Sequence, residues 1–351
     1  MKRNQMAVVA SAVSILAAGA TSSAQALTFN NTVLAGTSAQ ALQGFLDAEA
    51  RWSALFTDNV TINLTIGTAA LPANVIGSTS AIQALYSYFS VRADLVLDSK
   101  SADDAIAVAN LQAGPNFSML INRTTNNPNG AGSATPYVDN TGPNAANIRM
   151  TNANAKALGL LGNNAAGNDA SITFSDSFAF DFNPNDGINP AQFDFVGVAI
   201  HEIGHALGFI SGVDVLDSNA PGFADNAYTF VSTLDLFRFS AASVAANSID
   251  WTADTRAKYF SLDGGTTVGA GFATGTRFGD GRQASHWKDN LNLGIMDPTF
   301  AFGELGVIRA NDIQGFDAIG WDVAAIPEPS TYALFGLGLT AIGLLRSRRK
   351  S

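Results

Sequence analysis

Three histidines occur in the 351-residue chain, and two of them, His201 and His205, lie four positions apart in an apolar segment. Apolar residues at helical spacing predict a helix over Phe193–Ile210. One turn of that helix separates the two imidazoles, so both can reach a single cation. Zinc binds neutral imidazole and keeps one position open for water in catalytic sites. Glu202 projects beside the two histidines, where its carboxylate can take a proton from that water.

Two glycines in this segment need a reason, because glycine within a helix costs about 1 kcal/mol relative to alanine. We expect Gly204 to allow close packing of a neighbouring group. Gly208 most simply ends the helix in a left-handed turn.

A catalytic zinc ion needs a third protein ligand, which the helix does not supply. The remaining histidine, His286, stands next to Trp287, with Met296 ten residues downstream. The nearby Trp287 and Met296 favour His286 as the third ligand. Three carboxylates stay open as alternatives: Asp214, Asp217 and Glu304.

The run from His201 to Gly208 resembles the signature of the metzincin metalloproteases. Their third histidine follows the glycine by three residues, where this chain has Ser211. A late ligand histidine followed by a methionine resembles the leishmanolysin-like branch. The resemblance implies that His286 is the third zinc ligand and that Met296 is the Met-turn residue, an apolar floor beneath the metal. It also implies a protease in which Glu202 is the general base.

The resemblance covers roughly residues 170–325 and implies an α+β, two-lobed, metzincin-like fold. The N-terminal lobe, about 27–208, would hold a mixed sheet and helices. The C-terminal lobe, about 209–325, would be irregular, with the Met-turn and a closing helix. Metzincins often add a tyrosine two residues after the methionine, a position that Pro298 occupies here. The residue that stabilises the oxyanion is therefore not identified.

The first 26 residues have the three parts of a secretory signal peptide. Lys2 and Arg3 precede an apolar run, Met6–Ala20, and Ala24-Gln25-Ala26 forms a small-x-small cleavage site. We expect signal peptidase to cleave after Ala26.

The other end, 326–351, begins with Pro327-Glu328-Pro329, continues with the mostly apolar Tyr332–Leu345 and ends in a basic cluster. This order resembles the PEP-CTERM sorting signal of Gram-negative bacteria. The resemblance implies transient anchoring in the inner membrane, removal of the tail by an exosortase, and release to the cell surface or extracellular matrix. A permanent single-span anchor is the alternative, although the apolar segment is short for a bilayer.

Between these ends lies a body, 27–325, of 299 residues with 13 basic and 28 acidic side chains, a net charge of −15. A net charge of this sign and size argues against nucleic acids as partners. There is no cysteine, so stability has to come from core packing and bound metal. The partner that fits an enzyme of this kind is a protein or peptide substrate.

Periodicity and turn residues predict the other elements of the body. Ser38 and Ser101 are expected to cap helices. The expected segments are a helix over 38–56, a strand over 60–66, helices over 81–88 and 102–111, a surface loop over 122–147, a strand over 171–182 and a helix over 311–321, capped by Asn311 or Asp312 and ended by Gly320.

The sequence pattern for a second cation site is weaker than the pattern for the histidine site. Oxygen-bearing side chains alternate along one stretch as in a calcium loop: Asp181, Asn183, Asn185 and Asp186. An Asx-rich turn after a strand explains the same residues equally well.

Two function classes fit these features. One is an exported zinc-dependent endopeptidase. The other is a non-catalytic surface or biofilm-matrix protein that retains a structural zinc site. Glu202 favours the enzyme, because a structural zinc site closes all four positions with protein ligands and needs no base.

Overall fold

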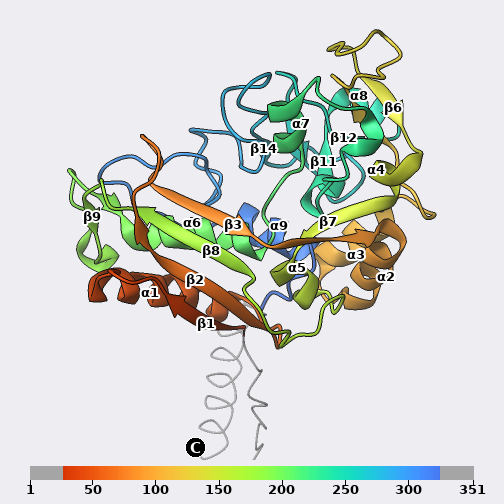
Figure 1. Ribbon diagram of the computed structural model, residues 1–351. Coiled ribbons are helices and arrows are strands. Elements are labelled where there is room, and N and C mark those ends of the chain that lie inside the picture. The colour runs from red at the N-terminus through yellow and green to blue at the C-terminus, as the bar shows by residue number, and fades with distance from the viewer. Residues whose placement is uncertain (1–26, 325–351) are drawn as a thin grey trace, which may run out of the picture.

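The computed structural model describes residues 27–324 and shows a mixed α+β fold with several small sheets (Figure 1). The α+β class predicted from the sequence is thus confirmed. The predicted signal peptide, 1–26, and sorting signal, 326–351, lie outside the described residues.

The described part of the chain contains the following elements. The strands are β1 Thr28–Val33, β2 Thr61–Ala69, β3 Gly77–Ala81, β4 Gln83–Ser87, β5 Met119–Ile121, β6 Tyr137–Asp139, β7 Asn147–Thr151, β8 Ala170–Ser175, β9 Phe180–Asp181, β10 Phe193–Asp194, β11 Arg238–Phe239, β12 Ile249–Asp250, β13 Lys258–Phe260 and β14 Gly271–Phe272. The α-helices are α1 Ala39–Leu55, α2 Tyr88–Asp98, α3 Ala102–Asn110, α4 Gly142–Ala146, α5 Asn152–Ala157, α6 Phe195–Leu207, α7 Val213–Asn219, α8 Ala241–Ala245 and α9 Ala310–Ala318.

The largest sheet has the strand order β1-β2-β8-β3. The first three strands are parallel, and β3 pairs antiparallel with β8, Gly77 opposite Phe174. The alternation predicted over 60–66 is confirmed, because β2 buries its apolar side chains and turns its polar ones to the opposite face. There the polar side chains bond to other polar residues, in the pairs Thr61–Asn164, Asn63–Asn30 and Thr65–Asn168. β3 is left as the outer strand on one side of this sheet.

Helices α1 and α6 pack against each other and against this sheet. Ser38 caps α1, as predicted, by accepting a hydrogen bond from the backbone of Ala41. Trp52 on α1 donates its indole N–H to the carbonyl of Ile200 on α6, at 3.0 Å. The aromatic rings of Phe45 and Phe195 meet edge-on 5.2 Å apart in the same interface. The apolar stripes of two helices distant in sequence thus form one core that holds α6 in place.

The strands after α6 are short. Three of them form a sheet of their own, with the order β11-β13-β14, and β12 joins β5 and β6 from before α6 in the order β12-β5-β6. Helix α9 returns to the α1–α6 core, where Phe316 packs edge-on against Trp52 at 4.7 Å. The positive φ of Gly320, 97°, ends this segment, as predicted. The last residues pair with the end of α1 through a bridge between Phe56 and Val323.

One predicted helix is wrong. The sequence indicates a helix over 81–88, but the structure has strand β4 over Gln83–Ser87, and the helix, α2, begins at Tyr88. Leu85 of β4 pairs opposite Arg149 of β7. The pairing partner is 64 positions away in sequence, and tertiary strand pairing overrides the local helical pattern.

Three further boundaries differ from the sequence prediction. The strand predicted over 171–182 is interrupted by a turn and forms β8 and β9. The surface loop predicted over 122–147 contains β6 and α4 and buries polar side chains such as Asn122 and Asn144. Helix α9 begins at Ala310, with Arg309 as its N-cap, so neither Asn311 nor Asp312 is the cap. By contrast, α3 is capped by Ser101 as predicted.

Candidate metal centre

Helix α6 carries the paired histidines and is buried along almost its whole length. Gly208 ends it with a φ of 119°, so the predicted left-handed stop is confirmed. Gly204 faces Met296, and a Cβ at this glycine would lie 2.5 Å from the methionine sulfur. The predicted close packing at Gly204 is therefore also confirmed, and its partner is the residue predicted to lie beneath the metal.

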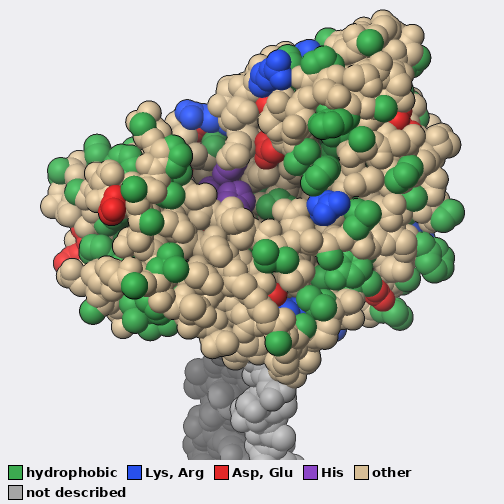
Figure 2. Space-filling view, in the orientation of Figure 1, with side chains coloured by type: hydrophobic (Ala, Val, Ile, Leu, Met, Phe, Trp, Pro, Cys, Tyr) green, Lys and Arg blue, Asp and Glu red, His purple; other side chains and the backbone are tan. Residues whose placement is uncertain are grey.

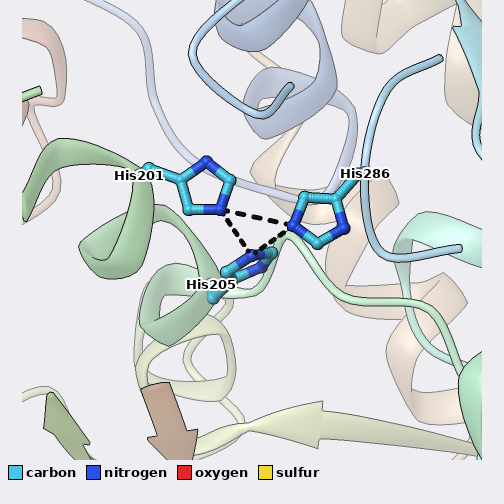
Figure 3. Close-up of side chains that lie close together, drawn as sticks. All are labelled: His201, His205 and His286. Carbon is cyan, nitrogen blue, oxygen red and sulfur yellow. Dashed lines mark hydrogen bonds between the residues drawn. The ribbon is translucent and has the colours of Figure 1, made fainter. Parts of the chain in front are cut away.

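The three histidines converge on one point (Figure 3). The Nε2 atom of His205 lies 3.1 Å from the Nε2 atoms of both His201 and His286. The Nε2 atoms of His286 and His201 are 3.3 Å apart. His201 and His205 come from α6, whereas His286 comes from a loop 81 positions further along the chain.

Each imidazole turns its other nitrogen, Nδ1, toward a backbone carbonyl oxygen. The distances are 2.8 Å from His201 to Ile295, 2.7 Å from His205 to Phe209 and 3.1 Å from His286 to Gln283. Burial lowers the pKa of His201 to about 3 and that of His205 to about 4, so these rings are neutral at pH 7. A neutral ring that donates from Nδ1 has a bare lone pair on Nε2.

Three lone pairs pointing at one another repel, and a cation between them removes the repulsion. Zinc–nitrogen bonds of 2.0–2.1 Å in a tetrahedral site place the nitrogens roughly 3.3 Å apart. The observed spacing of 3.1–3.3 Å fits that geometry. The carbonyl partners of Nδ1 are the groups that fix ring orientation in zinc sites. The three histidines therefore fit a zinc ion with one further position.

Glu202 lies against the outer strand β3. Its Oε2 atom accepts a hydrogen bond from the hydroxyl of Thr79 at 2.7 Å, and the same hydroxyl lies 2.8 Å from the Glu202 carbonyl oxygen. Gly77 leaves room for the carboxylate, because a Cβ there would lie 2.8 Å from Oε1. Burial raises the pKa of Glu202 to about 7. A carboxyl group with that pKa can both take up and release a proton near neutral pH.

The histidines and Glu202 line a cleft of about 670 Å³. Figure 2 shows the histidine side chains at the bottom of a hollow in this face of the molecule. The lining of the cleft comes from β3 and the residues before it, from α6, and from residues 282, 283, 285, 286 and 298–300. The site is thus accessible to a molecule larger than water.

Asp214, an alternative third ligand, has a different role in the structure. Its carboxylate accepts hydrogen bonds from the backbone N–H groups of Ala284 and Ser285, at 2.6 and 3.1 Å, and from the Ser285 hydroxyl. Asp214 therefore holds in place the loop residues immediately before His286. Ser211, at the position of the metzincin histidine, donates its hydroxyl to Asp235 instead.

The other two alternatives also have partners elsewhere. Asp217 accepts hydrogen bonds from the backbone of Arg277 and Phe278 at 2.7 and 2.8 Å. Glu304 is exposed and accepts one from the backbone of Ala301. Among His, Cys, Asp and Glu side chains of residues 27–324, the three histidines form the one group close enough to hold a metal ion together.

Two of the four side chains of the possible calcium loop accept hydrogen bonds from the backbone. Asp181 accepts hydrogen bonds from the N–H groups of Asn183 and Asn189, both at 2.9 Å, and Asn183 accepts one from Asn185. These bonds belong to the Asx turn that was the alternative reading. Asp186 ends the short 3₁₀ turn Pro184–Asp186 in the same exposed loop. Calcium binding stays a prediction.

The sequence did not indicate that Asp312 and Thr79 support the site. Asp312 accepts hydrogen bonds from the backbone of Ile295 and Met296, at 2.7 and 3.2 Å, and from the Trp287 indole at 2.9 Å. It thereby holds the carbonyl that His201 contacts. Thr79 carries no sequence signal at all, because its contact with Glu202 spans 123 positions. The only signal for Asp312 was its place in the first turn of a helix.

Comparison with known proteins identifies one segment. Residues 325–350 match the family described as the PEP-CTERM protein-sorting motif. No curated protein and no solved structure matches the chain. Within residues 27–324, no helix has both the length and the apolar character needed to cross a bilayer. The motif implies processing by an exosortase and export to the cell envelope or surface, so the chain is an exported bacterial protein with a C-terminal sorting signal.

Proposed function

We propose that this protein is an exported zinc-dependent endopeptidase of the metzincin type, with His201, His205 and His286 as the zinc ligands. The observation that carries the proposal is the convergence of three bare Nε2 atoms at 3.1–3.3 Å beside a buried glutamate in an open cleft. Zinc bound there would supply a Lewis acid that polarises the scissile carbonyl and lowers the pKa of a water molecule.

Glu202 is the proton carrier in this proposal. Its carboxylate takes the proton of the attacking water and returns it to the leaving amine. The hydroxyl of Thr79 holds Oε2 and so limits the rotation of the carboxylate. Met296 packs beneath the helix at Gly204 and has no exposed surface, in agreement with a floor that does not bind the metal.

The cleft also suits an extended peptide. β3 is the outer strand of its sheet, and residues 77–79 and 81 line the cleft. The unpaired edge of such a strand offers N–H and C=O groups to a chain that lies alongside it. A peptide bound in this way extends beyond the histidines in both directions. This arrangement favours cleavage of an internal peptide bond.

Metal content is the first test. The mature protein should bind close to one zinc ion per chain, measured by elemental analysis after gel filtration. His286→Ala should lose most of the zinc, because only two ligands remain. A variant that keeps full zinc occupancy would exclude His286 as a ligand.

Glu202→Gln separates the enzyme from a non-catalytic zinc protein. Glutamine keeps the shape of the side chain but cannot accept a proton, and loss of a general base costs about 10²–10⁴-fold in rate. We expect near-normal zinc content, a normal fold and at least a hundredfold slower cleavage of casein. Glu304→Gln, an exposed glutamate outside the cleft, is the matched control and should cleave at the wild-type rate. Zinc-loaded wild type that cleaves no peptide in a broad library would favour the surface-protein alternative.

A further inference from the structure

The walls of the cleft differ in charge from the rest of the molecule. The body between the two processed ends has a net charge of −15, yet no aspartate lines the cleft. Its charged lining residues, within the described chain, are Glu202 beside the histidines and Arg282, four residues before His286. A single cation in a cleft of an otherwise acidic protein creates a local preference for negative charge.

The backbone and side chain of Arg282 are both held in place. Its carbonyl accepts a hydrogen bond from the N–H of Gly275 at 2.9 Å. Its Nε atom donates to Asp289 at 2.8 Å, and the other oxygen of Asp289 accepts the hydroxyl of Thr299 at 2.9 Å. Thr299 also lines the cleft. The guanidinium group is therefore oriented by a carboxylate behind it, although 44% of the side chain is exposed.

The ion pair uses only one of the three guanidinium nitrogens. Nη1 and Nη2 of Arg282 make no hydrogen bond to any group of residues 27–324. These two nitrogens form a planar fork that matches the two oxygens of a carboxylate. Arg282 precedes the third histidine by four residues, and the intervening Gln283 supplies the carbonyl that His286 contacts. The fork is thus part of the loop that shapes the reaction centre.

We propose that Arg282 binds a carboxylate of the substrate and makes the protein selective for acidic peptides. The inference rests on the proposed function, since it names the substrate class of the same cleft. The carboxylate belongs either to an Asp or Glu side chain near the scissile bond or to the free C-terminus of a short peptide. Asp289 keeps the guanidinium oriented and leaves Nη1 and Nη2 for the ligand.

Paired peptides test the proposal. The zinc-loaded protein is given a library in which each position around the scissile bond is Asp or Asn, with the C-terminus as acid or amide. Wild type should cleave the preferred acidic member roughly five- to tenfold faster in kcat/KM, the size of a charge-assisted hydrogen bond at a half-exposed site. The preference should shrink in high salt. Preference for a side-chain carboxylate or for the terminal one distinguishes the two sources.

Variants assign the preference to one residue. Arg282→Met, which keeps an apolar stem, should abolish the preference, and Arg282→Glu should reverse it. Lys288→Met is the matched control, because Lys288 lies on the same loop, is 42% exposed and is paired with Asp280, but does not line the cleft. It should keep the wild-type ratio. Equal cleavage of Asp and Asn peptides by wild type, or an unchanged ratio in Arg282→Met, would overturn the proposal.

A binding measurement keeps the two proposals separable. Peptide hydroxamates bind an open zinc position without turnover, so their dissociation constants can be measured on wild type and on Glu202→Gln. Acidic hydroxamates should bind more tightly than neutral ones in both proteins, and equally in Arg282→Met. If wild type cleaves no peptide but shows this difference, the endopeptidase proposal fails and the role of Arg282 stands. If peptides are cleaved without any acidic preference, the proposed role of Arg282 fails and the endopeptidase proposal stands.

Discussion

Residues 27–208 and residues 209–324 satisfy their backbone hydrogen bonds in different ways. The first part is built on the four-stranded sheet and the long helices α1 and α6, in which N–H groups donate to carbonyls of the same ladder or helix. The second part has only short strands and three α-helices of at most nine residues among the residues described. Its loops need other acceptors, because a buried N–H group without a partner is costly.

Buried and half-buried aspartates are those acceptors. Each binds backbone N–H groups from a loop distant in sequence: Asp214 those of Ala284 and Ser285, Asp217 those of Arg277 and Phe278, Asp235 that of Gly212, and Asp312 those of Ile295 and Met296. The short side chain of aspartate suits this role, and aspartate makes up nearly all the acid in the body. The comparison shows that much of the negative charge of this protein is structural and lies inside.

The largest expected effect is the loss of such an acceptor. Asp312→Ala leaves the N–H groups of Ile295 and Met296 and the Trp287 indole without their acceptor. Removing one partner of a buried charged network costs about 3–5 kcal/mol. We expect a loss of that size in the free energy of unfolding, measured by urea denaturation, together with weaker zinc binding, because the carbonyl that orients His201 is released.

The matched control is a buried carboxylate of the first part. Glu49 on α1 accepts a single hydrogen bond, from Asn31 at 2.8 Å, and burial raises its pKa to about 7. Glu49→Gln should change stability by less than about 1 kcal/mol at pH 7. Equal losses in Asp312→Ala and Glu49→Gln would contradict the distinction between the two parts.

A second, smaller effect concerns pH and the carboxylate of Asp58. Burial and the neighbouring charge of Asp322 raise the pKa of Asp58 to about 8, although its carboxylate accepts a hydrogen bond from the backbone N–H of Asp322 at 3.0 Å. Since the folded-state pKa is above the unfolded one, the stabilisation is complete below about pH 4 and is lost as pH rises toward 8. We expect Asp58→Asn to be about 2 kcal/mol more stable than wild type at pH 8.

The comparison of wild type with Asp58→Asn at each pH isolates this carboxylate from all other titrating groups. Urea denaturation at pH 5 and pH 8 gives the required difference. If Asp58→Asn is less stable than wild type by the same amount at both pH values, the Asp58 carboxylate is stabilised by its surroundings. It would then resemble the aspartates of residues 209–324.

The smallest expected effect is a change in the catalytic rate through Thr79, a residue of the first part. Thr79→Val removes the hydroxyl that holds Oε2 of Glu202 while keeping the shape of the side chain. If the hydroxyl positions the base, kcat should fall about tenfold, the equivalent of one hydrogen bond to a charged group, with KM little changed. Thr79→Ser should restore most of the rate. A normal kcat in Thr79→Val, or no recovery in Thr79→Ser, would leave the hydroxyl a structural role only.

The candidate metal ligands and the candidate base could be predicted because their pattern is local or rare. His201, Glu202 and His205 lie within two turns of one amphipathic helix, and only one other histidine exists to join them. The left-handed end at Gly208 and the caps at Ser38 and Ser101 were predictable for the same reason, since each depends on a few neighbouring residues.

The residues that support the site were not predictable, because their partners are brought together by the whole fold. Strand β4 formed where a helix was expected, since its pairing with β7 crosses 64 positions. Asp214 was an alternative metal ligand in sequence but holds the backbone next to His286 instead. A carboxylate has the same chemistry in both roles, and only its surroundings decide which atoms it meets.

The sequence by itself therefore determined the candidate reacting groups and the sorting signal at the C-terminus. Short-range geometry is sufficient for these, because helix periodicity and the order of residues in a signal do not depend on the rest of the chain. The tertiary structure alone decided that Thr79 holds Glu202, that Asp312 holds the carbonyl beside His201, and that Arg282 lines the same cleft. These contacts join segments that are tens to more than a hundred residues apart, and only the packing of the complete core brings their side chains within bonding distance.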